Sequence, residues 1–431
     1  MIFVVTLMGV VFALSYALLD SMLSSRRAAK TANIESMGLR LAQAGVSKAT
    51  YCLNSSSPSK CGGTAGSGYP GETYSLGEGS VAITVTAVDS STKNISSTGT
   101  PVTEGKAETV LVSATTDPPT DKTIAFGNAT ISTGGGTYLY GTGATVRGDM
   151  RARDTLRCND TSANVYGIAY LSTSGGLVDS CTLRGDVHSD TVWNSVALRD
   201  VYYRGFFFDL WGTTVSGTKY SGATRPPVIP LPPIDLAFWR AQAVAGGTIS
   251  GNYAPSDGST LGPVMIDGDL TVNAGVHVTL TGTVWVTGNI VMNDPSWFSL
   301  SSSFGTFGTV VLADNAASPS SKGRITIGQN VGISGSGQPG SYVLFVSTNT
   351  STDYDNPAVR IDSSATKAAY IAQGGTARLM DNRTAAQLAG WRVYVNGGAT
   401  VDFTNSSLGT ARFGSYPPGT WRTISGTYRE Q

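Results

Sequence analysis

The sequence predicts a mainly β protein, with a long N-terminal α-helix, then a small antiparallel sheet and then a right-handed β-helix (solenoid). Three observations predict this fold class. The first nineteen residues carry no charge, residues 80–116 alternate apolar and polar side chains, and aliphatic phrases around Gly-Asp or Gly-Asn recur from residue 146 onward. These patterns are typical of an apolar helix, of half-buried strands and of stacked β-coils, respectively.

The low charge of the chain narrows the classes of function that it can have. Of its 431 residues only 13% are charged, and the formal net charge is zero, whereas about a quarter of residues are charged in typical proteins. Lysines and arginines are scattered rather than clustered, which argues against nucleic-acid binding. Abundant Gly, Ser and Thr suit a surface protein built of strands and turns, and the length allows two or three domains.

Residues 1–50 are expected to form one helix, apolar first and amphipathic later. Nineteen uncharged helical residues span roughly 28 Å, about the thickness of a bilayer core. A helix that is apolar all round must be buried in lipid or among copies of itself. The side chains expected in such a bundle are Met1, Phe3, Val4, Val5, Leu7, Val11, Phe12, Leu14, Leu18 and Leu19. Further along, one apolar stripe at helical spacing consists of Ile34, Met37, Leu41 and Ala44.

Residues 51–120 are expected to form a small antiparallel sheet with one face on the helix. Strands are predicted around 81–88, from Ile95 and from Glu108, because apolar residues alternate there with Thr, Ser and Ala. The following linker, 116–121, contains two consecutive prolines, which interrupt both helices and ladders.

The long helix followed by this sheet resembles the type IV pilins, in particular their minor-pilin-like branch, over roughly residues 1–116. The resemblance implies a subunit that polymerises through its N-terminal helix, with the pilus assembly machinery as a partner and the inner membrane as its location before assembly. Pilins usually carry a glutamate at the fifth mature position, where this chain has Val5 and no acidic residue before Asp20. Whether Met1 is the mature N-terminus, and whether the subunit is major or minor, stays open. A simple membrane anchor is the alternative, whereas a cleaved signal peptide usually has a basic n-region that is missing here.

From residue 121 the chain is expected to form two solenoid bodies, 121–223 and 244–431. Gly-Asp and Gly-Asn are turn dipeptides, and aliphatic residues on both sides predict strands that bend at a corner. The phrases are VRGDM (146–150), LRGDV (183–187), IDGDL (266–270) and VTGNI (286–290). The last two lie twenty residues apart, which is about one solenoid coil.

Residues 224–243 are expected to connect the two bodies. Five prolines within eight residues predict an extended, semi-rigid segment. A short helix is predicted from Ile234, with Asp235 near its N-terminus, where a negative charge is favourable. The side chains expected to plug a solenoid end are Leu236, Trp239 and Ala243. A further short helix is predicted at 385–391.

The four cysteines fall into two local pairs, Cys52 with Cys61 and Cys158 with Cys181. Each pair brackets a turn-rich segment, so disulfides within the pairs are the natural connectivity and fit an oxidising compartment. Neither pair has the spacing of a zinc site. Four buried free thiols are the alternative.

Residues 201–211 form the most aromatic stretch of the chain. We expect it to cap the first solenoid as core. A sugar-binding or subunit-contact platform is the alternative, because exposed aromatic side chains at this density need a partner. The residues are Tyr202, Tyr203, Phe206, Phe207, Phe208 and Trp211.

No catalytic residue, cofactor or metal site is predicted. Many β-helix proteins cleave polysaccharides with paired carboxylates, often with Ca²⁺. The best candidate for such a loop contains Asp353, Asp355 and Asn356, which we interpret as an ordinary solvated loop. His188 and His277 are isolated in the sequence, so the sequence does not favour a Ser-His-Asp catalytic arrangement.

The sequence thus predicts a non-enzymatic structural subunit of an extracellular filament at the cell surface. Copies of the chain would polymerise through the helix and display the solenoid for attachment to glycans or cell surfaces. The alternatives are a membrane-anchored monomeric adhesin, a minor pilin at a filament tip and, less favoured, a β-helix polysaccharide lyase.

Overall fold

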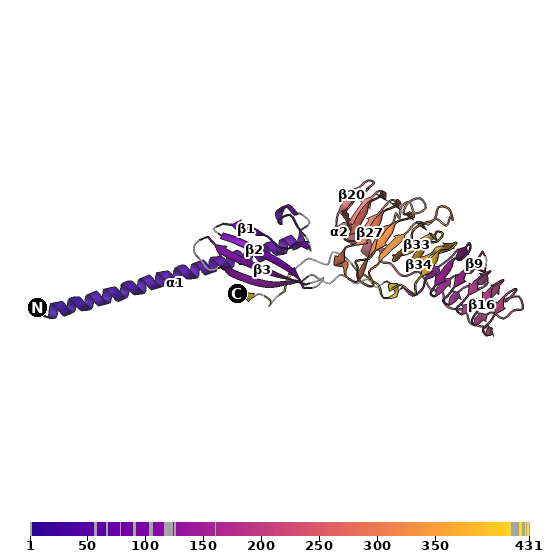
Figure 1. The fold of residues 1–431 in the computed structure, drawn as a ribbon, viewed down its shortest axis with the longest axis horizontal. Coiled ribbons are helices and arrows are strands. Elements are labelled where there is room, and N and C mark those ends of the chain that lie inside the picture. The colour runs from indigo at the N-terminus through magenta and orange to yellow at the C-terminus, as the bar shows by residue number, and fades with distance from the viewer. Residues whose placement is uncertain are drawn as a thin grey trace. The chain divides into compact units, whose positions relative to one another are not determined.

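The computed structural model describes residues 2–55, 58–65, 68–77, 79–88, 92–102, 107–115, 124, 126–159, 161–414, 422–424, 427 and 429–430, without the side chains of 2–17, 27–29, 33, 366, 422 and 430. The chain divides into two compact units (Figure 1). Unit 1 comprises Met1–Pro118 and Pro418–Gln431, and unit 2 comprises Pro119–Pro417. Unit 2 is therefore inserted into the sequence of unit 1.

Unit 1 consists of one long helix and one antiparallel sheet. Helix α1 spans Ile2–Asn54. The strands are β1 (Thr73–Leu76), β2 (Gly79–Ala87), β3 (Thr92–Pro101), β4 (Glu108–Thr115), β37 (Arg422–Thr423) and β38 (Arg429–Glu430). They lie in the order β1-β2-β3-β4, with β37 and β38 both paired to β4. The helix and the three predicted strands are confirmed. The prediction that the solenoid continues to residue 431 is wrong, because the end of the chain returns to this sheet.

The C-terminal half of α1 packs on the sheet. Its buried side chains are Leu41, Ala42, Val46, Ala49, Cys52 and Leu53. Gly45 lies where helix and sheet approach closely, since a Cβ there would collide with Ser97 Oγ and come within 2.6 Å of Val81. In the predicted stripe Leu41 is buried but Ala44 is only half-buried. The packed face of the helix is thus shifted toward Ala42 and Val46.

Unit 2 is a parallel β-helix, as predicted. Each coil carries up to three short strands, and strands at equivalent places in successive coils pair in parallel, which gives three faces. Thr130 pairs with Met150, Met150 with Ala169, and Ala169 with Val187, so these coils are 18 to 20 residues long. The inward side chains of all coils form one continuous apolar core.

The strands of each face can be given in spatial order. The first face contains β20 (Thr248–Ser250), β22 (Val264–Asp267), β25 (Val284–Val286), β28 (Phe307–Ala313), β31 (Val343–Ser347), β33 (Ala365–Leu379), β34 (Thr384–Asn396), β5 (Thr130–Ser132), β8 (Met150–Ala152), β11 (Ala169–Leu171), β14 (Val187–His188), β17 (Val201–Tyr203) and β19 (Lys219–Ser221). The second contains β23 (Leu270–Val272), β26 (Ile290–Met292), β29 (Ile325–Ile327), β32 (Val359–Ile361), parts of β33 and β34, β6 (Thr137–Tyr140), β9 (Thr155–Cys158), β12 (Leu177–Asp179) and β15 (Thr191–Trp193). The third contains β21 (Ser259–Leu261), β24 (His277–Leu280), β27 (Trp297–Leu300), β30 (Gly332–Ser334) and, further along, β35 (Thr400–Asp402), β7 (Thr145–Arg147), β10 (Asn164–Val165), β13 (Thr182–Leu183), β16 (Val196–Ala197) and β18 (Thr214–Val215). The short strand β36 (Arg412–Phe413) pairs with the start of β28.

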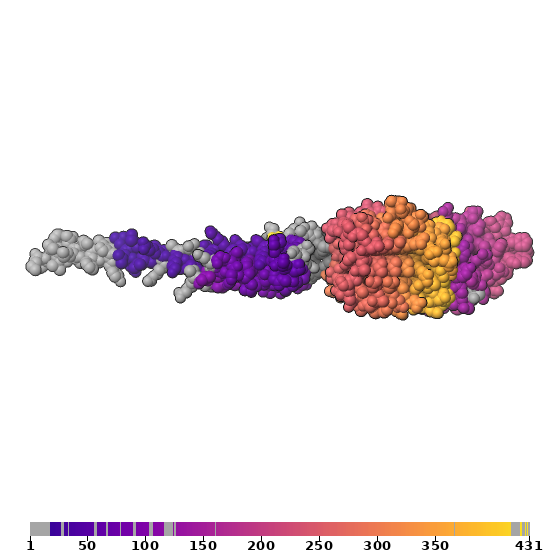
Figure 2. Space-filling model, turned by 90° about the horizontal axis from the view of Figure 1, so that it is seen from above, coloured from indigo at the N-terminus to yellow at the C-terminus, as the bar shows by residue number. Residues whose placement is uncertain are grey.

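The two predicted solenoid bodies are one body. β34 pairs directly with β5 and β6, and β35 pairs with β7. The coils that come last in the sequence therefore stack on those that come first, and Figure 2 shows the yellow surface directly beside the magenta one. The proline connector does not separate two cores. It returns the chain from the coil at one end, near β19, to the coil at the other end, near β20.

A second apolar cluster covers the outside of the first face. This side cluster consists of Ile124, Phe126, Ile131, Trp239, Val310, Leu312, Tyr342, Leu344, Val346, Ala369, Ile371, Ala386, Ala389, Leu408, Ala411 and Phe413. Helix α2 (Leu236–Ala245) supplies the fully buried Trp239, and Asp235 caps it by accepting a hydrogen bond from the Phe238 N–H. The predicted helix is confirmed, but it contacts β22 and β25 on the side of the solenoid rather than plugging an end.

The helix predicted at 385–391 is wrong, because these residues belong to β34. The inner core lies on one side of this strand and the side cluster on the other, so most of its residues are buried. A strand that is buried on both faces loses the alternation by which strands are recognised.

Candidate functional site

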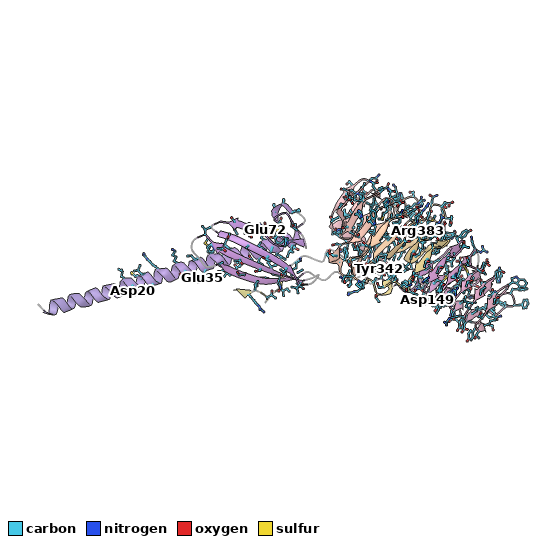
Figure 3. All side chains as sticks on the ribbon, in the orientation of Figure 1. Asp20, Glu35, Glu72, Asp149, Tyr342 and Arg383 are labelled. Atoms are coloured by element: carbon cyan, nitrogen blue, oxygen red, sulfur yellow. A yellow bond between two sulfur atoms is a disulfide. The ribbon has the colours of Figure 1, made fainter. Side chains whose placement is uncertain are left out.

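The N-terminal half of α1 exposes large apolar side chains. Leu18, Leu19, Met22 and Leu23 are 63%, 61%, 67% and 47% exposed, respectively. At about 100° per residue they occupy one side of the helix, whereas Ser24 lies on the other. Figure 3 labels Asp20 on this part of α1 and Glu35 near the point where the helix reaches the sheet of unit 1. We call the four apolar residues the apolar arc.

The rest of the predicted bundle surface is known only from the sequence. The side chains of Met1, Phe3, Val4, Val5, Leu7, Val11, Phe12 and Leu14 lie outside the described residues. Within the part of the chain that the structure describes, no helix is long and apolar enough to cross a membrane.

The aromatic stretch lies at the end of the solenoid that is formed by β17, β18 and β19. Phe206, Phe207, Phe208 and Trp211 are 63%, 87%, 61% and 59% exposed, respectively. The expectation that they are core is therefore wrong, because among the described residues no further coil stacks on the last one to bury them. We call these four residues the aromatic tip.

The loop that carries the aromatic tip is fixed by a buried carboxylate. Asp209 is 2% exposed and accepts hydrogen bonds from the N–H groups of Gly205 and Phe206 and from Nη2 of Arg204, at 3.0, 2.7 and 2.8 Å. The hydrogen bond to Asp209 raises the pKa of the Arg204 guanidinium. The indole N–H of Trp193 donates to the carbonyl of Phe208 at 2.7 Å. The four rings are thus presented on a preorganised loop.

Tyr202 belongs to a ladder of stacked rings rather than to the tip. Its ring lies 4.2 Å from His188 and 4.6 Å from Tyr220, and His188 lies 5.1 Å from Tyr170, between ring centroids. Burial is the main cause that lowers the pKa of His188. Tyr203 packs against the inner core. Stacking between coils thus explains Tyr202 and His188, whereas packing on the core explains Tyr203.

Both predicted disulfides are present, Cys52–Cys61 in unit 1 and Cys158–Cys181 in unit 2. The second joins the ends of two coils, since Cys158 ends β9 and Cys181 follows β12. Both cross-links close short loops, of 9 and 23 residues, and so restrict the unfolded chain.

In the loop that was considered as a cation site, the carboxylate of Asp353 accepts hydrogen bonds from the backbone of the same loop. Asp353 Oδ1 accepts hydrogen bonds from the N–H groups of Asp355 and Asn356, at 2.7 and 3.4 Å. Among the residues that the structure describes, no three His, Cys, Asp or Glu side chains gather as metal ligands would. His277 stacks on Trp297 and lies 3.2 Å from Asp257, in an exposed pair on the third face.

A polar groove that the sequence did not predict crosses one corner of the solenoid. Its volume is about 510 Å³. It is lined by Tyr140, Gly141, Thr142, Asn159, Tyr354, Arg378, Asp381, Asn382, Asn396, Gly397 and Gly398. These residues come from both sides of the junction between β34 and β6, so they are brought together only by the unpredicted order of the coils. The available signals in the sequence were Tyr140 beside the turn of Gly141 and Gly143, and the turn of Gly397 and Gly398.

Comparisons with known proteins give matches among solved structures alone. No protein-family model and no curated protein matches the chain. Among solved structures three chains match. One is the competence-associated pilin ComZ from Thermus thermophilus, which is 12% identical, with a TM-score of 0.31 over 94% of this chain and 97% of that chain. This chain is thus similar to a pilin at low identity and low structural overlap.

Proposed function

We propose that this protein is a structural subunit of an extracellular filament that assembles through the N-terminal half of α1. The observation that carries the proposal is the apolar arc of Leu18, Leu19, Met22 and Leu23, which one chain leaves exposed. Burial of apolar surface is favourable by about 25 cal/mol per Å². Copies that pack α1 against α1 remove the arc from water, and the uncharged sequence of residues 1–17 extends the same contact.

The C-terminal half of α1 supports this assignment by contrast. There Leu41, Ala42 and Val46 are already buried on the sheet of unit 1 within a single chain. The inner membrane would hold the apolar segment before assembly, and the two disulfides suit an oxidising compartment. Unit 2 then supplies the surface for attachment, with the aromatic tip as its most exposed apolar feature.

The proposal is tested by placing a charge on the apolar arc. Met22→Asp buries an unpaired carboxylate in the helix bundle, which costs several kcal/mol, and we expect it to abolish filaments in material sheared from producing cells. Ser24→Asp places the same charge on the opposite side of the helix and should leave more filaments than Met22→Asp. Both residues are exposed in the single chain, so neither change should affect its folding.

Normal filaments from Met22→Asp would contradict the helix contact. Absence of filaments from the unmodified protein, with the chain found only in membranes, would favour a membrane-anchored adhesin instead.

A further inference from the structure

We propose that the corner groove of unit 2 binds a neutral oligosaccharide. This inference deepens the attachment role proposed for unit 2 and does not depend on filament assembly. The groove crosses the turns of four successive coils, at 381–382, 397–398, 141–142 and 159. Since neighbouring strands lie about 4.8 Å apart, four coils give an elongated groove of roughly 14 Å, which fits a chain of sugar rings better than a single ring.

The walls of the groove are aromatic. Tyr354 lies against Tyr394 with ring centroids 4.8 Å apart, and Tyr140 lies 5.9 Å from Tyr354 and 6.1 Å from Tyr394. Tyr140 remains 43% exposed. Tyrosine rings combine an apolar face with a hydroxyl group, which suits sugars because a pyranose ring has an apolar C–H face and a rim of hydroxyl groups.

Two buried polar side chains in the lining carry polar atoms without a partner in the described structure. Arg378 is 7% exposed and its Nε has no hydrogen-bond partner, although its Nη1 donates to the carbonyl of Tyr354 at 2.9 Å. Asn396 is 5% exposed and its Oδ1 has no partner, whereas its Nδ2 donates to the Tyr354 hydroxyl at 3.1 Å. Buried polar groups are normally paired. The Arg378 Nε–H and the Asn396 Oδ1 are therefore a donor and an acceptor that a ligand could pair with after a small shift of these side chains.

The charges at the groove favour a neutral ligand. The guanidinium of Arg378 is 3.9 Å from the carboxylate of Asp355, which partly offsets its charge, and the exposed Asp381 is the one carboxylate in the described lining. An anionic ligand would meet the carboxylate of Asp381. Hydroxyl groups both donate and accept hydrogen bonds, so a neutral saccharide can pair with the guanidinium, the amide and the carboxylate at once.

Glycines keep the floor of the groove open. Gly141 and Gly398 have positive φ angles of 90° and 68°, whereas Gly397 has no positive φ. A Cβ on Gly397 would meet nothing nearer than the Thr142 carbonyl at 3.4 Å, whereas a Cβ on Gly398 would collide with Asn382. Gly397→Tyr therefore fills the groove without forcing the backbone.

The test uses the full chain on an array of neutral tetrasaccharides of glucose, galactose, mannose and N-acetylglucosamine, together with uronic-acid tetrasaccharides. We expect retention of at least one neutral tetrasaccharide. With that sugar, Gly397→Tyr should abolish binding, and Tyr140→Ala and Asp381→Ala should each weaken it about tenfold, the range for losing an aromatic contact or a hydrogen bond to a charged group. Tyr166→Ala, a matched tyrosine that is 46% exposed elsewhere on the solenoid, should leave binding unchanged.

Other outcomes overturn the inference. They are no binding to any neutral sugar, binding to uronic acids alone, and neutral binding that survives Gly397→Tyr. Neutral binding that is lost in Phe207→Ala but kept in Gly397→Tyr would place the ligand at the aromatic tip instead. Filaments are counted in the same preparations, so a failure of sugar binding and a failure of assembly are distinguishable.

Discussion

The two units differ in how completely one chain buries its apolar surface. Unit 2 buries it twice, in the continuous core inside the coils and in the side cluster beneath α2. Unit 1 buries only the C-terminal half of its helix, and the apolar arc stays in water. Unit 2 thus leaves its most exposed large apolar side chains at the aromatic tip, whereas unit 1 leaves the apolar arc exposed along its helix. This difference supports our proposal that copies assemble through unit 1 and that unit 2 serves attachment.

The largest loss of stability is expected from a substitution in the side cluster, which covers the first face of unit 2. Trp239 is fully buried in the side cluster, and truncating a buried aromatic side chain costs about 3–5 kcal/mol. Trp239→Ala should thus lower the stability of unit 2 by that amount and leave unit 1 unchanged. Amide hydrogen exchange of the full chain measures the two units separately. Phe207→Ala removes an exposed ring and is the matched control, and equal losses from the two variants would mean that the side cluster does not stabilise the solenoid.

A smaller loss of stability is expected from a substitution at the contact between α1 and the sheet of unit 1. Gly→Ala normally favours a helix by about 1 kcal/mol, but a Cβ on Gly45 would collide with Ser97 Oγ and lie 2.6 Å from Val81. Gly45→Ala should therefore destabilise unit 1, by about 1–3 kcal/mol for an overpacked contact. At Gly38 the nearest atom is Glu108 Cγ at 3.0 Å, in a flexible side chain. Gly38→Ala should be near neutral in the same denaturation experiment, and a stabilised Gly45→Ala variant would show that the contact is looser than described.

The smallest effect concerns the pH dependence of unit 2. Burial, which outweighs the nearby Asp186, lowers the pKa of His188 in the folded state, so the unfolded chain binds a proton more readily. The contribution of this residue to stability is present above the ordinary pKa of about 6.5 and is lost as the pH falls below it. His188→Tyr, which continues the ring ladder, should reduce the loss of stability between pH 7 and pH 5. An unchanged pH profile of hydrogen exchange would exclude His188 as its source.

Local patterns predicted most single elements of the fold. The uncharged run and proline-free stretch predicted α1, the alternation at 81–88 predicted β2, and Asp235 predicted the start of α2. The cysteine pairs were predicted for the same reason, since each pair is close in the sequence. These features depend on residues that are near one another along the chain.

Long-range pairing could not be predicted in this way. Leu388 pairs with Thr130, more than 250 residues earlier, and Arg429 pairs with Leu111. No local pattern specifies which coil stacks on which, so the sequence suggested two bodies where there is one. The corner groove was missed for the same reason, because Tyr140 and Arg378 meet only across that junction. The exposure of the aromatic tip likewise depends on its place in the last coil.

The central claim is that copies of this chain assemble through α1. Electron cryomicroscopy of filaments sheared from producing cells, with the protein identified by mass spectrometry, tests it most directly. We expect a filament core of bundled α1 helices in which the side chains of Leu18, Leu19, Met22 and Leu23 contact neighbouring copies. Filaments whose subunits contact one another only through unit 2, with the apolar arc still exposed to solvent, would contradict the account.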